Sequence, residues 1–214
     1  MDITSIRSVL HYLSKNILPT KFETAQQPDP NTVQLCFRGV DSQTWLEVSW
    51  NGDSPRILKI NKPEKVGRES TLSKQIRYGL KYMALISIDQ DEFERVIKFG
   101  FAKKPGDEIS KYLIFELMGK HSNIFYVDNK HKIIAVGKQI KSSQSSFRTI
   151  STGSIYSDPP VNLKKQPREG EKDGDNYYFL NQEMFKEMIE KNLFLEWAQF
   201  AGNYYGTPFC IISF

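Results

Sequence analysis

Residues 111–128, KYLIFELMGKHSNIFYVD, decide the predicted fold of this chain. Two apolar runs, 112–115 and 124–127, are rich in β-branched and aromatic residues and have the length of strands. The joint between them, residues 116–123, holds a carboxylate, a Met, a Gly and a Lys. We therefore predict two strands and a joint. Either this is a core hairpin with a merely polar loop, or the joint has a function of its own.

Similar strand-like segments recur on both sides of this stretch. They are separated by polar residues, Gly or Pro, and the Asn51-Gly52 pair is a strong hairpin signal. The predicted strands lie at residues 33–37, 46–50, 56–60, 84–88, 95–101 and 132–136, and residues 147–156 could add one more. The polar residues 23–31, which include a Pro, are predicted to form a loop.

Two stretches have helical spacing instead. The apolar residues of the first are Ile6, Leu10, Leu13 and Ile17. Leu18-Pro19 ends this helix, and Ser70 or Thr71 opens a second, short one. Many short strands with two short helices predict an α+β fold, built mostly as an antiparallel sandwich or barrel.

The character of the sequence changes after Asp158-Pro159-Pro160. Residues 162–176 are rich in charge, Gly and Gln and almost lack apolar residues. After them we predict a short strand at 177–180, a helix capped by Asn181, a strand at 194–200 and a tight loop at 202–208. The predicted domains are 1–160 and 161–214, the second a small and incomplete α/β segment.

Composition argues against a membrane-spanning, secreted or disulfide-bonded protein. The chain has 214 residues, and no apolar run approaches the roughly 20 residues needed to cross a bilayer. The N-terminus is too polar for a secretion signal, so we expect a cytoplasmic protein. Cys36 and Cys210 are the only cysteines, which excludes a disulfide framework and, with three scattered His, argues against a zinc site. We predict neither a metal nor a cofactor.

Charge is unevenly distributed along the chain. Residues 1–160 carry 23 Lys and Arg against 17 Asp and Glu, whereas residues 161–214 carry 6 against 8. A modestly basic first part would tolerate a polyanionic partner such as a nucleic acid.

Charged residues on neighbouring predicted strands form one candidate site. Arg95 and Lys120 could each hold a phosphate, and Glu94 and Glu116 could orient them or contact a base edge or a ribose hydroxyl. An ordinary surface ion pair between Glu94 and Arg95 is the alternative. Gly119-Lys120 does not belong to a phosphate loop, because Ile114 and His121 stand where that motif requires Gly and Ser or Thr.

Residues 1–160 resemble the N-terminal domain of the NFACT family, the fibronectin-binding-protein-A-like proteins of bacteria and their eukaryotic ribosome-quality-control relatives. The matching stretches are LSKQIRYGLKYMALISIDQ, ERVIKF, KYLIFELMGKHSNIFYVD, KIIAVGKQI and RTISTGSIYSDPP. The resemblance implies a β-rich fold related to the N-terminal domain of formamidopyrimidine-DNA glycosylases, without the glycosylase chemistry. The family's helix-hairpin-helix, coiled-coil and further RNA-binding parts are not recognised in this sequence.

The resemblance also implies a function and a site. The family engages stalled large ribosomal subunits that carry peptidyl-tRNA and recruits tRNA for untemplated tailing of the nascent chain. The implied contact residues are Glu94, Arg95, Glu116, Leu117, Met118, Gly119 and Lys120. Glu94 replaces the family's usual Asp, and its extra methylene displaces the carboxylate. The preferred tRNA, the oligomeric state and any adhesion to host proteins stay open.

Residues 167–208 resemble a second family, in the GMP-binding region of guanylate kinase. The implied GMP-binding residues are Lys165, Arg168, Tyr177, Glu196, Tyr205, Gly206 and Thr207. Arg and Tyr hydroxyls can hold a phosphate, and a Glu can accept hydrogen bonds from guanine. Lys165 stands where the family has an Arg, and a Lys cannot supply the bidentate fork. No ATP-binding phosphate loop is found, so we expect no kinase activity.

Three interpretations follow from the sequence. The chain is an RNA- and ribosome-binding module, or a guanylate kinase fragment that retains the GMP-binding region, or a chain in which neither part functions in this form. We expect a fusion of two fragments, of natural origin or from an assembly or frameshift error.

Overall fold

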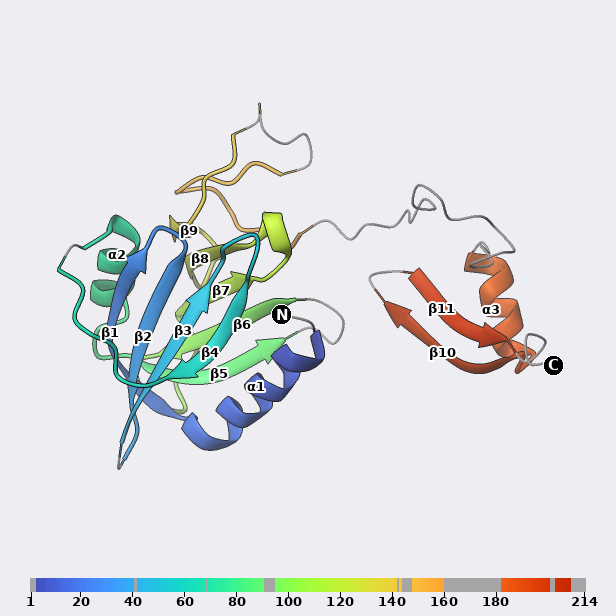
Figure 1. Cartoon of the computed structure of the whole chain (residues 1–214), viewed down its shortest axis with the longest axis horizontal. Helices are drawn as coiled ribbons and strands as arrows, with labels where there is room; N and C mark the ends of the chain where they lie inside the picture. Colours follow the sequence, from blue (N-terminus) through green and yellow to red (C-terminus); the bar gives the residue numbers. More distant parts are fainter. Residues whose placement is uncertain are drawn as a thin grey trace. The chain divides into compact units, whose positions relative to one another are not determined.

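One antiparallel sheet forms the centre of the first compact unit, Met1–Asp158, in this computed structural model (Figure 1). The structure describes residues 3–40, 42–67, 69–90, 95–141, 143, 148–159, 182–200 and 203–208. Within these ranges the sheet consists of β1 (Thr20–Asp29), β2 (Thr32–Arg38), β3 (Gln43–Ser49), β4 (Arg56–Ile60), β5 (Ala84–Gln90), β6 (Val96–Ala102), β7 (Lys111–Glu116), β8 (Asn123–Asp128) and β9 (Ile133–Val136). Their spatial order is β4-β3-β2-β1-β5-β6-β7-β8-β9. The predicted fold, mostly antiparallel sheet with a few short helices, is confirmed.

Two helices flank the sheet where helical spacing predicted them. They are α1 (Ile3–Ile17) and α2 (Thr71–Gly79). The apolar residues of α1 turn inward, and Ile6 and Leu13 are fully buried. Ser70 caps α2, because its hydroxyl accepts a hydrogen bond of 2.9 Å from the backbone N–H of Ser73. The helices thus cover parts of the sheet with their apolar faces.

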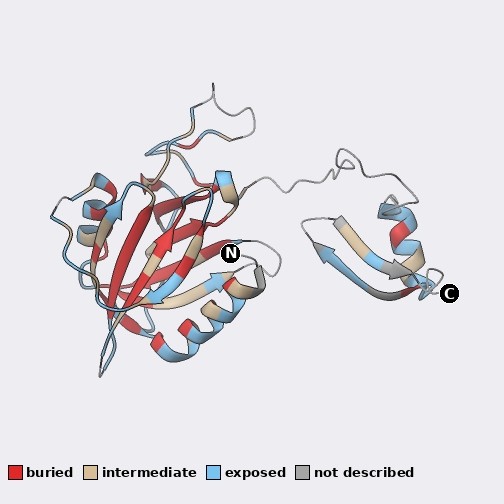
Figure 2. Ribbon diagram, in the orientation of Figure 1, coloured by how far each residue is buried: buried red, intermediate tan, exposed pale blue. Residues whose placement is uncertain are grey.

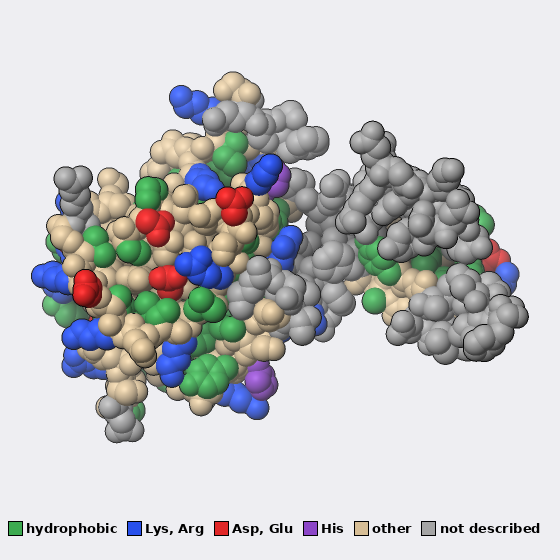
Figure 3. Space-filling view, in the orientation of Figure 1, with side chains coloured by type: hydrophobic (Ala, Val, Ile, Leu, Met, Phe, Trp, Pro, Cys, Tyr) green, Lys and Arg blue, Asp and Glu red, His purple; other side chains and the backbone are tan. Residues whose placement is uncertain are grey.

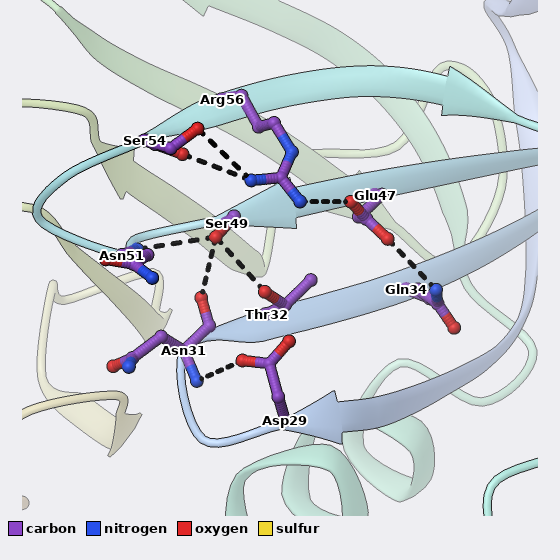
Figure 4. Close-up of polar contacts among 9 residues, drawn as sticks. All are labelled: Asp29, Asn31, Thr32, Gln34, Glu47, Ser49, Asn51, Ser54 and Arg56. Atoms are coloured by element: carbon purple, nitrogen blue, oxygen red, sulfur yellow. Dashed lines mark hydrogen bonds and ion pairs between the residues drawn. The ribbon is translucent and has the colours of Figure 1, made fainter.

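Strand alternation separates an inner from an outer face of the sheet. Val33 and Leu35 of β2 are fully buried in the apolar core, whereas Gln34 between them lies on the opposite face of the strand, where it is buried among polar side chains. On the outer face, Glu47 of β3 accepts hydrogen bonds from Gln34 at 3.1 Å and from Arg56 of β4 at 2.8 Å (Figure 4). A polar ladder therefore ties three strands together outside the core.

The two halves of the sheet, β1–β4 and β5–β9, face a common core (Figure 2). Phe37 of β2 stacks on Phe101 of β6 with ring centroids 6.5 Å apart, and Phe22 of β1 meets Phe101 edge-on at 6.2 Å. Rings from strands far apart in the sheet can meet only if the sheet curls over. The curled sheet gives the rolled, sandwich-like form that the sequence predicted.

Close contacts beyond the ends of β3 and β9 fasten this curled sheet. Trp50, directly after β3, is fully buried. A Cβ atom at Gly137, directly after β9, would lie 2.8 Å from Trp50 Nε1 and 2.8 Å from Ile124 Cγ2. Lys138 Nζ donates a 3.2 Å hydrogen bond to the carbonyl of Trp50. Gly137 is therefore required by the close approach of the indole.

Two predictions for the first part of the chain were wrong. Residues 23–31 were expected to form a loop, but β1 extends to Asp29, because its backbone pairs with β2 along most of its length. Residues 147–156 were considered as one more possible strand. Their described part, 148–156, forms only two isolated bridges, Lys132↔Ile155 and Ile140↔Ile150, because it pairs with its neighbours at single points.

The second compact unit spans Pro159–Phe214 and is described by itself. Its described elements are α3 (Gln182–Glu190), β10 (Phe194–Phe200) and β11 (Asn203–Pro208). Phe185 of α3 stacks on Phe194 of β10, with ring centroids 4.2 Å apart, and on Tyr204 of β11 at 5.4 Å. The predicted helix and the strand at 194–200 are confirmed.

Residues 202–208 were expected to form a tight loop, and this was wrong. Residues 203–208 form β11, which pairs antiparallel with β10 from Phe200↔Asn203 onward. Pairing with β10 satisfies the backbone that a loop would have left to solvent. The predicted strand at 177–180 lies outside the described residues. No described helix has the length and apolarity needed to span a membrane.

We expect Gly137→Ala to lower the free energy of unfolding by about 1–3 kcal/mol, because the added methyl group would press on the buried Trp50 indole. Urea denaturation measures the effect. Gly67→Ala is the control, since nothing lies within 4 Å of a Cβ atom there. Equal stability of both variants would contradict the contact.

Candidate nucleic-acid interface

The motif residues meet where β6 begins and β7 ends. Glu116, the last residue of β7, pairs with Val96, the first residue of β6. The backbone N–H of Leu117 then donates a 2.9 Å hydrogen bond to the carbonyl of Arg95. Arg95 is thereby held beside the joint that follows β7, as the sequence predicted for neighbouring strands. Glu94 lies outside the described residues.

The joint forms a short 3₁₀ turn, η1 (Gly119–His121). Gly119 has φ of +59°, a conformation that glycine adopts without steric cost. The turn is closed by a 2.9 Å hydrogen bond from the backbone N–H of Ser122 to the carbonyl of Gly119. The β3–β4 loop supports it from the side, since a Cβ atom at Gly52 would lie 3.1 Å from Lys120 Cα.

The predicted contact residues divide into an exposed and a buried group. Arg95 and Lys120 are exposed, and Met118 and Gly119 are partly exposed. Leu117 is fully buried and Glu116 is 2% exposed. The structure thus brings the predicted residues from 95 to 120 together, with two cations at the surface and a carboxylate beneath them.

The buried carboxylate of Glu116 has two partners from a distant segment. Arg148 Nη1 lies 2.8 Å from Glu116 Oε1, and the Tyr156 hydroxyl donates a 3.0 Å hydrogen bond to the same oxygen. The guanidinium of Arg148 also lies over the rings of Phe125 and Tyr156, at 5.3 and 5.0 Å from their centroids. Glu116 therefore anchors residues 148–156 to the end of β7.

Burial changes the titration of this cluster. It raises the pKa of Glu116 above its ordinary value, although Arg148 and the Tyr156 hydroxyl act in the opposite direction. The contribution of this carboxyl to stability is therefore complete below its ordinary pKa and declines as the pH rises toward the raised value. Burial, together with the adjacent Glu116, also raises the pKa of Tyr156, so its hydroxyl remains a donor.

Sequence reasoning assigned no role to Asn123, Arg148 or Tyr156. Asn123 Oδ1 accepts hydrogen bonds of 2.9 and 2.8 Å from the backbone N–H groups of Ile124 and Lys138, and its amide donates to the Lys138 carbonyl at 2.8 Å. It ties the joint to the segment after β9. All three residues lie within the stretches that resemble the NFACT family, but no local sequence pattern predicts which residues they contact.

The basic side chains are distributed rather than clustered. On the face seen in Figure 3, Lys and Arg side chains are spread over the first unit and form no single patch. Within the described residues, no group of three His, Cys, Asp or Glu gathers into a metal-binding cluster. The exposed Arg95 and Lys120 beside β6 and β7 can each bind a single phosphate.

The described part of the predicted GMP site lies on the β10–β11 hairpin. Glu196 pairs directly with Thr207, and the neighbouring pairs contain Gly206 and Tyr205. A Cβ atom at Gly206 would lie 2.6 Å from the Phe194 ring, so this glycine permits close packing. The remaining predicted residues, Lys165, Arg168 and Tyr177, lie outside the described residues.

We expect Arg148→Met to destabilise the fold at neutral pH by about 3–5 kcal/mol, because the Glu116 carboxylate would remain buried without its counter-charge. The loss should shrink as the pH falls, since a protonated Glu116 needs no cation. Urea unfolding of variant and wild type at several pH values measures the difference.

The double variant Arg148→Met/Glu116→Gln provides the control for this prediction. Removing both charges should recover part of the lost stability, because no unpaired carboxylate remains. A loss in Arg148→Met that stays constant as the pH falls would show that Glu116 is not the group concerned.

Known proteins of two kinds each resemble part of the chain. The protein named Rqc2 homolog RqcH from Streptococcus pneumoniae is 41% identical over 150 residues, which cover 63% of this chain and 27% of that protein. Guanylate kinase from Prochlorococcus marinus is 76% identical over 49 residues, which cover 23% of this chain and 27% of that enzyme. The chain thus spans about a quarter of the length of each of these relatives.

Solved structures match the fold. The N-terminal domain of fibronectin-binding protein PavA from Streptococcus pneumoniae has a TM-score of 0.68 at 27% identity and covers 87% of this chain and 68% of that one. The N-terminal part of the fibronectin/fibrinogen-binding protein from Streptococcus suis has a TM-score of 0.69 at 27% identity, with coverages of 88% and 70%.

A family model supplies the classification. The model described as NFACT N-terminal and middle domains matches residues 2–202. This match includes nearly the whole first unit and extends into the second. The chain belongs to the NFACT family, because the family model matches most of its length and the curled antiparallel sheet and the joint after β7 agree with that match.

Proposed function

We propose that the first unit is an RNA- and ribosome-binding module of ribosome quality control. It recognises tRNA and stalled large ribosomal subunits in the cytoplasm and catalyses no reaction. The observation that carries this proposal is the position of Arg95 and Lys120. Both are exposed, and the hydrogen bond between Leu117 and Arg95 holds their segments side by side.

Each exposed residue suits a different kind of contact with RNA. Arg95 offers a planar guanidinium that can bind a phosphate through two hydrogen bonds, whereas Lys120 offers a point charge. Met118 presents a partly exposed thioether that can pack against a ribose or a base. Gly119 has no side chain to keep a phosphate from the backbone of the turn.

The buried residues of the motif serve this contact indirectly. Glu116 and Leu117 lie beneath the turn and are nearly inaccessible, so their role is to hold it in place. Glu116 does so through Arg148 and Tyr156. We propose Glu94 as a further contact, on the resemblance alone.

We expect Arg95→Ala and Lys120→Ala each to weaken binding to large ribosomal subunits or tRNA by about tenfold, because each removes a charged hydrogen bond. Each should also reduce the slope of log affinity against log salt concentration by about 1. A pull-down with large subunits, with and without tRNA, over a salt series measures both quantities.

Lys191→Ala is the matched control for this experiment. It removes one exposed positive charge directly after α3 in the second unit and should leave affinity and slope unchanged. If Arg95→Ala and Lys120→Ala bind like the wild type, the contact edge is assigned wrongly.

A second candidate function is binding of GMP by the second unit without phosphoryl transfer. It is favoured by the pairing of Glu196 with Thr207 across β10 and β11. These are the residues to which the resemblance assigns reading of guanine. The 76% identity to a guanylate kinase over 49 residues supports the same assignment.

We expect GMP to stabilise the second unit against heat by about 2.7 kcal/mol at about 100 times its Kd, because a ligand that binds only the folded state shifts unfolding. AMP at the same concentration should have no effect. Glu196→Gln should reduce the shift, because the amide keeps one acceptor oxygen and turns an N–H donor toward the second guanine N–H group. Equal melting temperatures with and without GMP would remove this candidate.

A further inference from the structure

Two tyrosines, Tyr78 in the last turn of α2 and Tyr82 in the turn between α2 and β5, are unusually exposed for aromatic residues. Tyr78 is 64% exposed and Tyr82 is 69% exposed, although both lie two residues from the buried Leu80 and Tyr82 directly precedes the buried Met83. Leu80 is fully buried and Met83 is 8% exposed. The turn is thus anchored in the core while its rings point to solvent.

Cations surround both rings. The guanidinium carbon of Arg77 lies 4.8 Å from the centroid of Tyr78, and its Nη2 donates a 2.9 Å hydrogen bond to the Tyr78 hydroxyl. The ammonium groups of Lys81 and Lys21 lie over the ring of Tyr82, at 4.9 and 5.7 Å. Positive charge therefore lies close to both exposed rings, and the Arg77 guanidinium is also paired with the Glu69 carboxylate.

The backbone holds Tyr82 in an uncommon conformation. Its φ is +68°, which few residues other than glycine adopt and which carries a cost in energy. Hydrogen bonds on both sides fix this turn: Met83 N–H donates to the Leu80 carbonyl at 3.0 Å, and Phe22 N–H donates to the Met83 carbonyl at 2.9 Å. The ring is held outward before any partner arrives.

We propose that this turn is a stacking platform for unpaired bases of a single-stranded RNA segment. Tyr78 and Tyr82 would each stack on one base. This contact does not depend on the RNA sequence, because every base has a flat π face. Lys21 and Lys81 would then move from the ring of Tyr82 to the flanking phosphates, whereas Arg77 would stay paired with Glu69. The two tyrosines and Arg77 would also suit a protein partner, but Lys21 and Lys81 favour a polyanion, because lysine is depleted at protein–protein interfaces.

The platform is separate from the proposed contact edge at Arg95 and Lys120. Ala84 at the start of β5 pairs with Ala102, whereas Gln90 at its end pairs with Ile97, close to Arg95. The two surfaces therefore lie at opposite ends of a seven-residue strand, about 20 Å apart. The inference rests on the proposed function for its class of partner, but each surface can be tested alone.

The test uses the full chain and a fluorescein-labelled single-stranded RNA of about 10 nucleotides, with binding measured by fluorescence anisotropy. We expect Tyr78→Ala and Tyr82→Ala each to weaken binding about tenfold. Tyr78→Phe and Tyr82→Phe should bind like the wild type, because they keep the ring. Blunt double-stranded RNA should compete poorly, because its bases are already stacked on one another.

Tyr12→Ala is the matched control. Tyr12 on α1 is 45% exposed, and Lys59 Nζ lies 5.3 Å from its ring centroid, so it reproduces a tyrosine–lysine pair at another place. It should not affect RNA binding, and thermal melting confirms that each variant folds. Wild-type affinity in both alanine variants, or an equal loss in Tyr12→Ala, overturns the platform.

The outcomes distinguish this inference from the proposed function. If the tyrosine variants bind single-stranded RNA normally while Arg95→Ala loses large subunits, the platform is wrong and the proposed function stands. If the tyrosine variants lose single-stranded RNA while Arg95→Ala and Lys120→Ala keep large subunits, the platform stands and the contact edge is wrong.

Discussion

The structure around the candidate site depends on a single buried ion pair. Glu116 and Arg148 side chains are 3% and 12% exposed, so both charges have left water almost completely. Such a pair is tolerated when additional hydrogen bonds satisfy the carboxylate, and the Tyr156 hydroxyl supplies one. The pair joins the end of β7 to a segment with no strand of its own, and so keeps that segment on the sheet.

This constraint explains why one short motif contains residues of opposite burial. Glu116 and Leu117 belong to the interior, whereas Arg95 and Lys120 belong to the surface. The buried part fixes the direction in which the chain leaves β7, and Gly119 lets it turn at once. A rigid base beneath two cations reduces the entropy lost on binding a polyanion. The proposed RNA contact is therefore a property of the whole joint.

The two proposed RNA-binding surfaces share the same scaffold. The contact edge lies where β6 begins, and the platform lies where β5 begins, so the length of β5 separates them. The core behind both ends is filled by large buried rings such as Phe22 and Phe99. An RNA that spans this distance would be held at two points, which raises its overall affinity through effective concentration.

The sequence by itself determined the class of fold, most of the strands and the helices, because apolar periodicity records which side of each element is buried. It also located the joint after β7 and placed Arg95 near Lys120. It failed at β1 and β11, where polar and glycine-containing stretches became strands because a partner strand was available.

Only the tertiary structure decided which partners the buried and exposed groups received. Arg148 lies 32 residues from Glu116, and Tyr156 lies 40 residues from it, so no local spacing could pair them. The exposure of Tyr82 likewise depends on a strained turn rather than on the amphipathic pattern of α2. Local patterns report whether a residue is buried, whereas the identity of its partner is set by the packing of segments distant in the chain.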